Sequence, residues 1–157
     1  MKRLFLSLIS LFLFLSLVSC TASYGHCELI LALDNEYQEV KSSGFDKCYT
    51  NGIYAVGIVR ISFEAGFNQG IAETMSASEF AEFWKTKTER DATVETDAVT
   101  PYYTYEADGY FYLSGFYRSP LAYFVVLLSA PTGVSLEARE DFIKILDGAK
   151  FDLTRNL

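Results

Sequence analysis

The segment from Ala122 to Ala130 limits the possible folds more than any other part of the sequence, because its central residues are apolar at every position. A strand with one face in water alternates apolar and polar residues, whereas a strand covered on both faces is apolar throughout. We therefore expect this segment to be the central strand of a sheet that carries a layer of structure on each face.

Two dipeptides predict further strands, since Asn51-Gly52 and Asp108-Gly109 are both typical of tight hairpin turns. The first would join residues 48–50 to a strand over 53–63, in which both alternating sets of residues are apolar. A type I′ turn at Asp108-Gly109 would place several tyrosines on one face of its ribbon. These are Tyr103, Tyr105, Tyr110 and Tyr112. Hairpins of this kind make the sheet antiparallel.

Two amphipathic helices are available to cover the sheet. Ser76-Ala77-Ser78-Glu79 fits a capping box before one helix, and Ser135 is a candidate N-cap for a second. The second would carry Phe142, Ile143 and Leu146 on its apolar side, pair Glu140 with Lys144, and end at Gly148. With a first strand over 28–34, the prediction is an α+β fold, an antiparallel sheet with helices on both faces. Residues 150–153 either add a short strand or dock against it.

The N-terminus predicts export. Met1-Lys2-Arg3 is basic, and the apolar run from Leu4 to Val18 is shorter than the about 20 residues that a membrane-spanning helix needs. The following Leu17-Val18-Ser19-Cys20 resembles the lipobox of bacterial lipoprotein signal peptides. This resemblance implies that a diacylglyceryl group is attached to the Cys20 thiol and that cleavage precedes Cys20. The fatty acyl chains, such as palmitate, then anchor the chain stably. The alternative is an ordinary secreted protein cut at another site.

These features divide the chain into a signal peptide over 1–19, a lipidated cysteine with a short tether over 20–27, and one domain over 28–157. The expected location is outside the cytoplasm, attached to the bacterial cell membrane by the lipid. Without Lys2 and Arg3 the basic residues number 11 against 20 acidic ones, a net charge of −9. Such a surface repels phosphates, so nucleic acid is excluded as a partner.

The two remaining cysteines, Cys27 and Cys48, are free to oxidise in an exported protein, so we expect a disulfide between them. The alternative is a pair of unpaired thiols. With only His26 nearby they do not make a tetrahedral metal set, and the sequence predicts neither a metal site nor a cofactor.

The order of these elements resembles the Mog1/PsbP-like fold found in small bacterial lipoproteins. The resemblance spans about residues 28 to 153. Its patterns are the first strand with Glu36-Tyr37, Gly44-Phe45 before a hairpin, one mid-chain helix, a tyrosine-rich meander, and a closing helix of the form Phe142-Ile143-x-Ile145-Leu146-x-x-x-x-Phe151. It implies an α/β/α sandwich. It implies no catalytic residues, because the members share the sandwich and not a chemistry.

The sequence offers few candidate catalytic residues. The sequence contains no nucleotide-binding, zinc-protease or serine-hydrolase motif. His26 beside Cys27 suggests a dyad, but its place behind the tether would hold it poorly. Gly66 to Gly70 is expected to be a flexible connection, and Glu137, Glu140 and Asp141 a solvated helix start.

The clustered tyrosines Tyr103, Tyr105, Tyr110 and Tyr112 are the remaining feature with functional content. Tyrosines combine flat apolar area with a polar tip, which suits a binding surface for a protein or small-ligand partner; the alternative is that a helix covers them. We therefore expect a lipid-anchored envelope protein that acts as a noncatalytic binding or accessory module. The alternative is a small envelope hydrolase whose site is assembled only in three dimensions.

Overall fold

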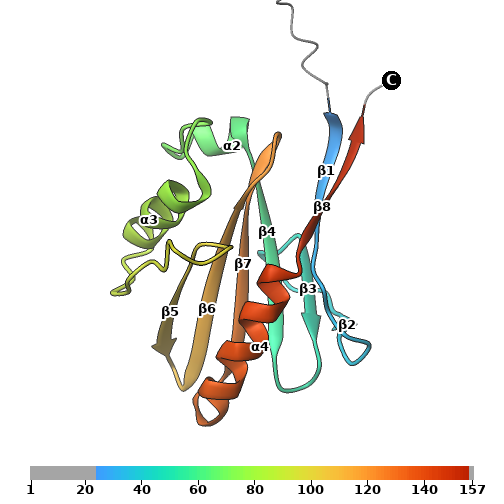
Figure 1. Ribbon diagram of the computed structural model, residues 1–157, viewed down its shortest axis with the longest axis vertical. Coiled ribbons are helices and arrows are strands. Elements are labelled where there is room, and N and C mark those ends of the chain that lie inside the picture. The colour runs from blue at the N-terminus through green and yellow to red at the C-terminus, as the bar shows by residue number, and fades with distance from the viewer. Residues whose placement is uncertain (1–23, 156–157) are drawn as a thin grey trace, which may run out of the picture.

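The protein folds around a six-stranded antiparallel sheet with strand order β2-β3-β4-β7-β6-β5 (Figure 1). The structure is a computed structural model and describes residues 24–155. In chain order the strands of this sheet are β2 (Gln38–Glu39), β3 (Lys47–Thr50), β4 (Ala55–Ser62), β5 (Tyr102–Ala107), β6 (Tyr110–Arg118) and β7 (Ala122–Pro131). The α+β class and the antiparallel sheet are as predicted.

Strand β7 is the central strand that the sequence predicts. It pairs along its length with β4 on one side and with β6 on the other. Its alternate side chains enter two separate cores: Phe124, Val126 and Leu128 face one, while Tyr123 and Val125 face the other. The uninterrupted apolar run thus reflects burial on both faces.

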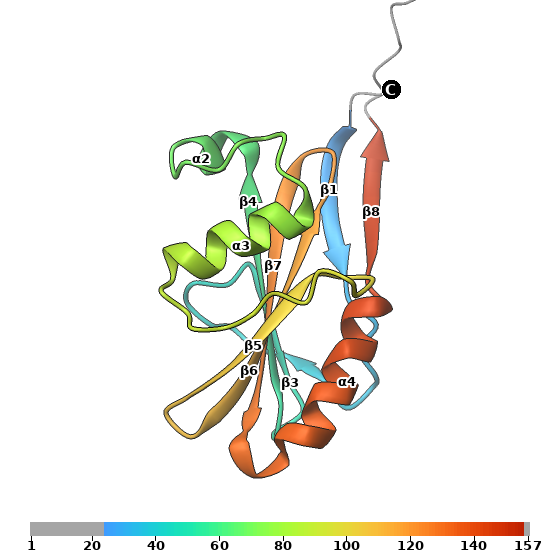
Figure 2. The same cartoon turned by 60° about the vertical axis from the view of Figure 1, so that its left-hand side comes forward.

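One face of the sheet is covered by α2 (Phe63–Phe67) and α3 (Ala77–Lys87) (Figure 2). The capping box predicted before α3 is present, because the Ser76 hydroxyl accepts from the Glu79 amide and the Glu79 carboxylate accepts from the Ser76 amide. Phe80 of α3 is fully buried and packs on Phe116 and Tyr123 of the sheet. This contact fixes α3 above β6 and β7.

The other face is covered by α4 (Ser135–Asp147) together with a two-stranded antiparallel ribbon of β1 (Tyr24–Ile30) and β8 (Lys150–Arg155) (Figure 1). Phe142 and Leu146 of α4 are buried as expected. Leu146 lies close enough to the sheet that a Cβ at Gly115 would be 2.6 Å from its side chain. The covering layer on this face is therefore a helix and a ribbon, where the sequence predicted a helix.

Several expected boundaries are wrong. The first strand is Tyr24–Ile30 and not 28–34, because its partner β8 begins opposite Ile30 and leaves the following residues unpaired. It also starts within the segment expected to be a tether. Helix α4 begins directly after a short 3-10 turn (Thr132–Val134), so Ser135 is its first residue and not its cap. Lys144 pairs with Asp141, at 3.1 Å, instead of Glu140.

The hairpin at Asn51-Gly52 forms, but with a longer loop than predicted. The Asn51 side-chain oxygen accepts from the amides of Ile53 and Tyr54, at 3.0 and 2.7 Å, so these residues stay in the loop and β4 begins at Ala55. Asp108-Gly109 makes the predicted tight turn, with φ of 53° and 80°. None of the helices among residues 24–155 is long and apolar enough to cross a membrane.

Candidate functional site

The structure places the four predicted tyrosines on one face of the β5–β6 hairpin, in the predicted register: Tyr105 lies opposite Tyr112 and Ala107 opposite Tyr110. They differ in burial. Tyr103 is 2% exposed and packs beside Phe116 beneath α3, whereas Tyr110 is 48% exposed. The stripe therefore contributes to the core at one end and is open to solvent at the other.

At the solvent-exposed end of the stripe, the tyrosine rings stack on one another. The rings of Tyr105 and Tyr112 stack at a centroid separation of 4.9 Å and an interplanar angle of 15°, and both side chains are half-buried. The Arg90 guanidinium lies 4.3 Å above the Tyr105 ring, a cation–π geometry. Burial is the main cause that raises the pKa of Tyr105. We call Tyr105, Tyr110 and Tyr112 the tyrosine tip; the turn end of its hairpin extends beyond α3 (Figure 2).

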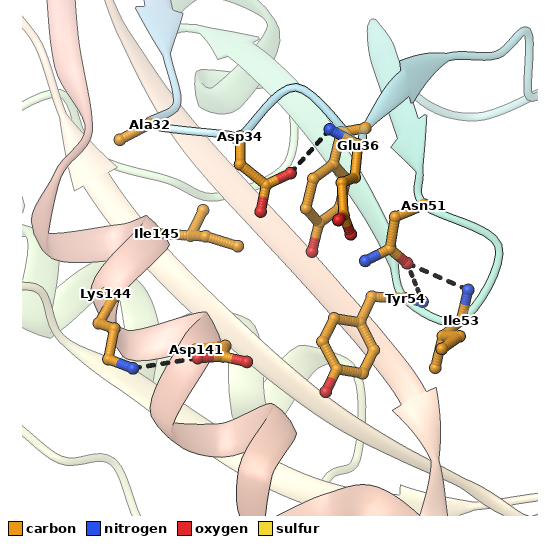
Figure 3. Close-up of a pocket in the computed structure, with 10 residues that line it drawn as sticks. Ala32, Asp34, Glu36, Asn51, Ile53, Tyr54, Asp141, Lys144 and Ile145 are labelled. Atoms are coloured by element: carbon orange, nitrogen blue, oxygen red, sulfur yellow. Dashed lines mark hydrogen bonds and ion pairs between the residues drawn. The ribbon is translucent and has the colours of Figure 1, made fainter.

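A second surface feature is a cleft of about 410 Å³ on the opposite face of the sheet, which we call the acidic cleft (Figure 3). Three segments form it: the loop after β1, the β3–β4 loop, and α4. Its lining residues are Ala32, Asp34, Glu36, Tyr37, Asn51, Ile53, Tyr54, Asp141, Lys144 and Ile145. Sequence reasoning missed this site, because its parts are far apart in the chain.

Local backbone geometry positions the side chains of the cleft. Asp34 accepts a hydrogen bond from the Glu36 amide at 2.9 Å, which fixes the turn that presents both acids. The Tyr54 ring meets Phe142 of the core edge-on at 5.2 Å. Asp141 was expected to belong to a solvated helix start; it is half-buried and lines the cleft.

The acidic cleft has a negative electrostatic potential, as the pKa values of its two tyrosines indicate. Burial, followed by the charges of Asp34 and Asp141, raises the pKa of Tyr37 to about 12. Burial and then Asp141 also raise the pKa of Tyr54. A negatively charged carboxylate makes a nearby phenolate less favourable. The acids of the cleft are therefore close enough to act on both tyrosine hydroxyls.

The predicted disulfide is contradicted, since Cys27 and Cys48 are both free. Cys27 of β1 is buried against the face of the sheet that carries the ribbon. Lys47 points to the same face, where it pairs with Glu28 of β1. Because side chains alternate along a strand, Cys48 next to Lys47 points to the opposite face. The two thiols therefore cannot meet without a change of register.

The other candidate residues are not brought together into a catalytic group. His26 lies 3.6 Å from Glu28, while the neighbouring Cys27 thiol is fully buried. The predicted connection over 66–70 begins inside α2, where Gly66 is buried against Ile71, and continues as an exposed turn over residues 68–70. Residues 24–155 contain no cluster of three or more acidic, cysteine or histidine side chains suited to a metal ion. Cys20 lies outside the described residues.

Comparison with protein-family models and with curated proteins finds no match to this chain. The Mog1/PsbP-like assignment therefore stays a prediction. Among solved structures, a protein from Bacteroides thetaiotaomicron aligns with a TM-score of 0.51 and 10% identity over 83% of this chain and 48% of its own. LpqN, described as involved in cell envelope biogenesis of Mycobacterium tuberculosis, aligns with a TM-score of 0.46 and 10% identity, over 81% of this chain and 84% of its own. This chain spans about half the length of the Bacteroides protein, and their likeness is one of fold.

Proposed function

We propose that this protein is a lipid-anchored, extracytoplasmic binding module, without catalytic activity, that engages a partner protein through the tyrosine tip. The N-terminal apolar run and the resemblance of residues 17–20 to a lipobox support the anchor. Strand β1 begins at Tyr24, so little chain separates Cys20 from the domain. The domain would therefore sit close to the membrane.

The observation that carries the proposal is the exposure of a preorganised aromatic surface. Tyr105 and Tyr112 are already stacked in the free protein, and Tyr110 beside them is nearly half exposed. Interface cores are enriched in tyrosine and arginine, and rigid aromatic side chains lose little conformational entropy on binding. Arg90, held over Tyr105, adds an arginine, a residue type that is enriched among the residues contributing most to binding.

The burial and the contacts of the candidate reactive groups favour a binding role over hydrolysis. The thiol beside the only histidine is buried, so it offers no accessible nucleophile. In the acidic cleft, Asp34 accepts the Glu36 amide and Asp141 pairs with Lys144. The lining of the cleft also contains no serine, cysteine or histidine that these acids could activate as a nucleophile or base.

The test is site-specific photocrosslinking in intact cells. The crosslinker p-benzoylphenylalanine replaces Tyr110 in one strain and Leu136 in a control strain. Leu136 is a matched control because it is also a large exposed residue, 73% exposed, but lies on α4 across the sheet. We expect one discrete protein adduct from position 110 and none from position 136. An identical adduct pattern at both positions, or none at position 110, would refute the role of the tyrosine tip.

A further inference from the structure

The acidic cleft has more negative charge than its own cation neutralises. Lys144 is its cation and pairs with Asp141 at 3.1 Å. Asp34 and Glu36 have no ion-pair partner among residues 24–155. Two carboxylates on one wall are therefore available to a positively charged ligand, and the same charges repel an anion.

Aromatic groups line the same cleft. Tyr37 and Tyr54 both line it, and Figure 3 shows the Tyr54 ring there. Neither hydroxyl makes a hydrogen bond to another described residue. A ring face attracts a cation, and a phenolic oxygen accepts a hydrogen bond from it. The pKa of each tyrosine is raised, so both hydroxyls are neutral at physiological pH.

The shape of the cleft limits the size of the ligand. A volume of about 410 Å³ lies in the range of small-molecule sites. Ile53, which is 62% exposed, and the half-buried Tyr54 offer apolar surface within the same cleft. An alkyl chain would cover this surface while its charged end reaches the acids.

We propose that the acidic cleft binds an organic cation, namely a primary ammonium group on a short alkyl chain. The ammonium group donates to the carboxylates of Asp34 and Glu36 and lies against the tyrosine rings, and the alkyl chain packs on Ile53. This site is on the face of the sheet opposite the tyrosine tip. It therefore adds a second ligand to the proposed function and does not depend on it.

The test is calorimetric titration of the full mature chain in detergent. Two amine probes distinguish the sources of the ammonium group: cadaverine represents a free amine, and Nα-acetyl-lysine N-methylamide represents a lysine side chain in a peptide. The diol 1,5-pentanediol is the neutral control, with the same chain length as cadaverine. We expect at least one amine to bind about tenfold more tightly than the diol, and its affinity to fall as salt is added.

Variants assign the binding to the cleft. Asp34→Asn retains the oxygen that accepts the Glu36 amide but removes the charge, and we expect a loss of about threefold to fivefold in amine affinity. Glu36→Gln, at an exposed position, serves as the second variant should the first not fold. Asp108→Asn is the matched control, because it removes the same charge at the β5–β6 turn, which does not line the cleft. Equal affinity for amines and diol, no amine binding at millimolar concentration, or the same loss in Asp108→Asn would overturn the proposal.

Discussion

At the scale of single residues, Tyr37 shows how a carboxylate-lined cleft acts on one side chain. Burial is the larger cause of its raised pKa, and the charge of Asp34 is the next. Its folded pKa is higher than its unfolded one, so folding favours the neutral phenol. The stabilisation that this provides is complete below about pH 10 and is lost as the pH rises through about 12.

We predict that a site-specific NMR titration of the Tyr37 ring gives a pKa near 12, and that Asp34→Asn lowers it toward the ordinary value of 10.0. Removing a nearby negative charge makes the phenolate less costly. Asp108→Asn provides the comparison, since Asp108 does not line the cleft and its charge is not among the causes of the raised Tyr37 pKa. A Tyr37 pKa near 10 in the unmodified protein would show that the cleft is more hydrated than its geometry indicates.

At the scale of elements, the β5–β6 hairpin combines buried and exposed side chains in one row of tyrosines. Helix α3 and Phe116 bury Tyr103, whereas nothing in residues 24–155 covers Tyr110 to the same degree. The sequence left open whether a helix covers the tyrosines or leaves them exposed. Each alternative holds for one end of the row, since one end is core and the other is surface.

We predict that Tyr103→Ala lowers the free energy of unfolding by about 3 to 5 kcal/mol, as expected for a large aromatic side chain removed from a core. Tyr110→Ala should cost about 1 kcal/mol or less, because an exposed side chain contributes little to folding. Urea denaturation of the two variants measures both values. Comparable losses in the two would mean that the whole stripe is core, leaving no aromatic surface for a partner.

The register of the β5–β6 hairpin and the central place of β7 were predictable because they rest on local patterns. The tight turn at Asp108-Gly109, with its positive φ angles, sets the register of the tyrosines. The apolar run at β7 indicated that this strand is central in the sheet. The apolar run over 28–34 predicted the wrong bounds for the first strand. The strand ends at Ile30 because its partner β8, from the other end of the chain, begins opposite that residue. The disulfide failed for a similar reason: which face each cysteine occupies depends on strand pairing, not on its distance in sequence.

The acidic cleft could not be predicted because no local pattern marks it. Asp34, Tyr54 and Asp141 meet only when α4 packs beside the β3–β4 loop. In the sequence, Asp141 has the same appearance as any acid in the first turns of a helix. The sequence did single out Asn51-Gly52, Glu36-Tyr37 and Asp141, but as a hairpin, a fold pattern and a helix start rather than as parts of a ligand site.

At the scale of the whole molecule, the sheet separates two surfaces of different chemistry. The tyrosine tip lies on the face covered by α2 and α3, and the acidic cleft lies on the face covered by α4 and the β1–β8 ribbon. Strand β1 follows directly on the segment that we propose carries the anchor. The ends of β1 and β8 lie side by side, so both described termini are at the same end of the molecule (Figure 1).

The central claim, a domain held at the membrane by lipid on Cys20, is tested most directly by mass spectrometry of the N-terminal peptide from membrane-extracted protein. We predict that the peptide begins at Cys20 and carries a diacylglyceryl group, and that Cys20→Ser leaves residues 1–19 attached to an unmodified chain. A mature chain that begins at another residue, or a Cys20 that carries no lipid, would contradict the account.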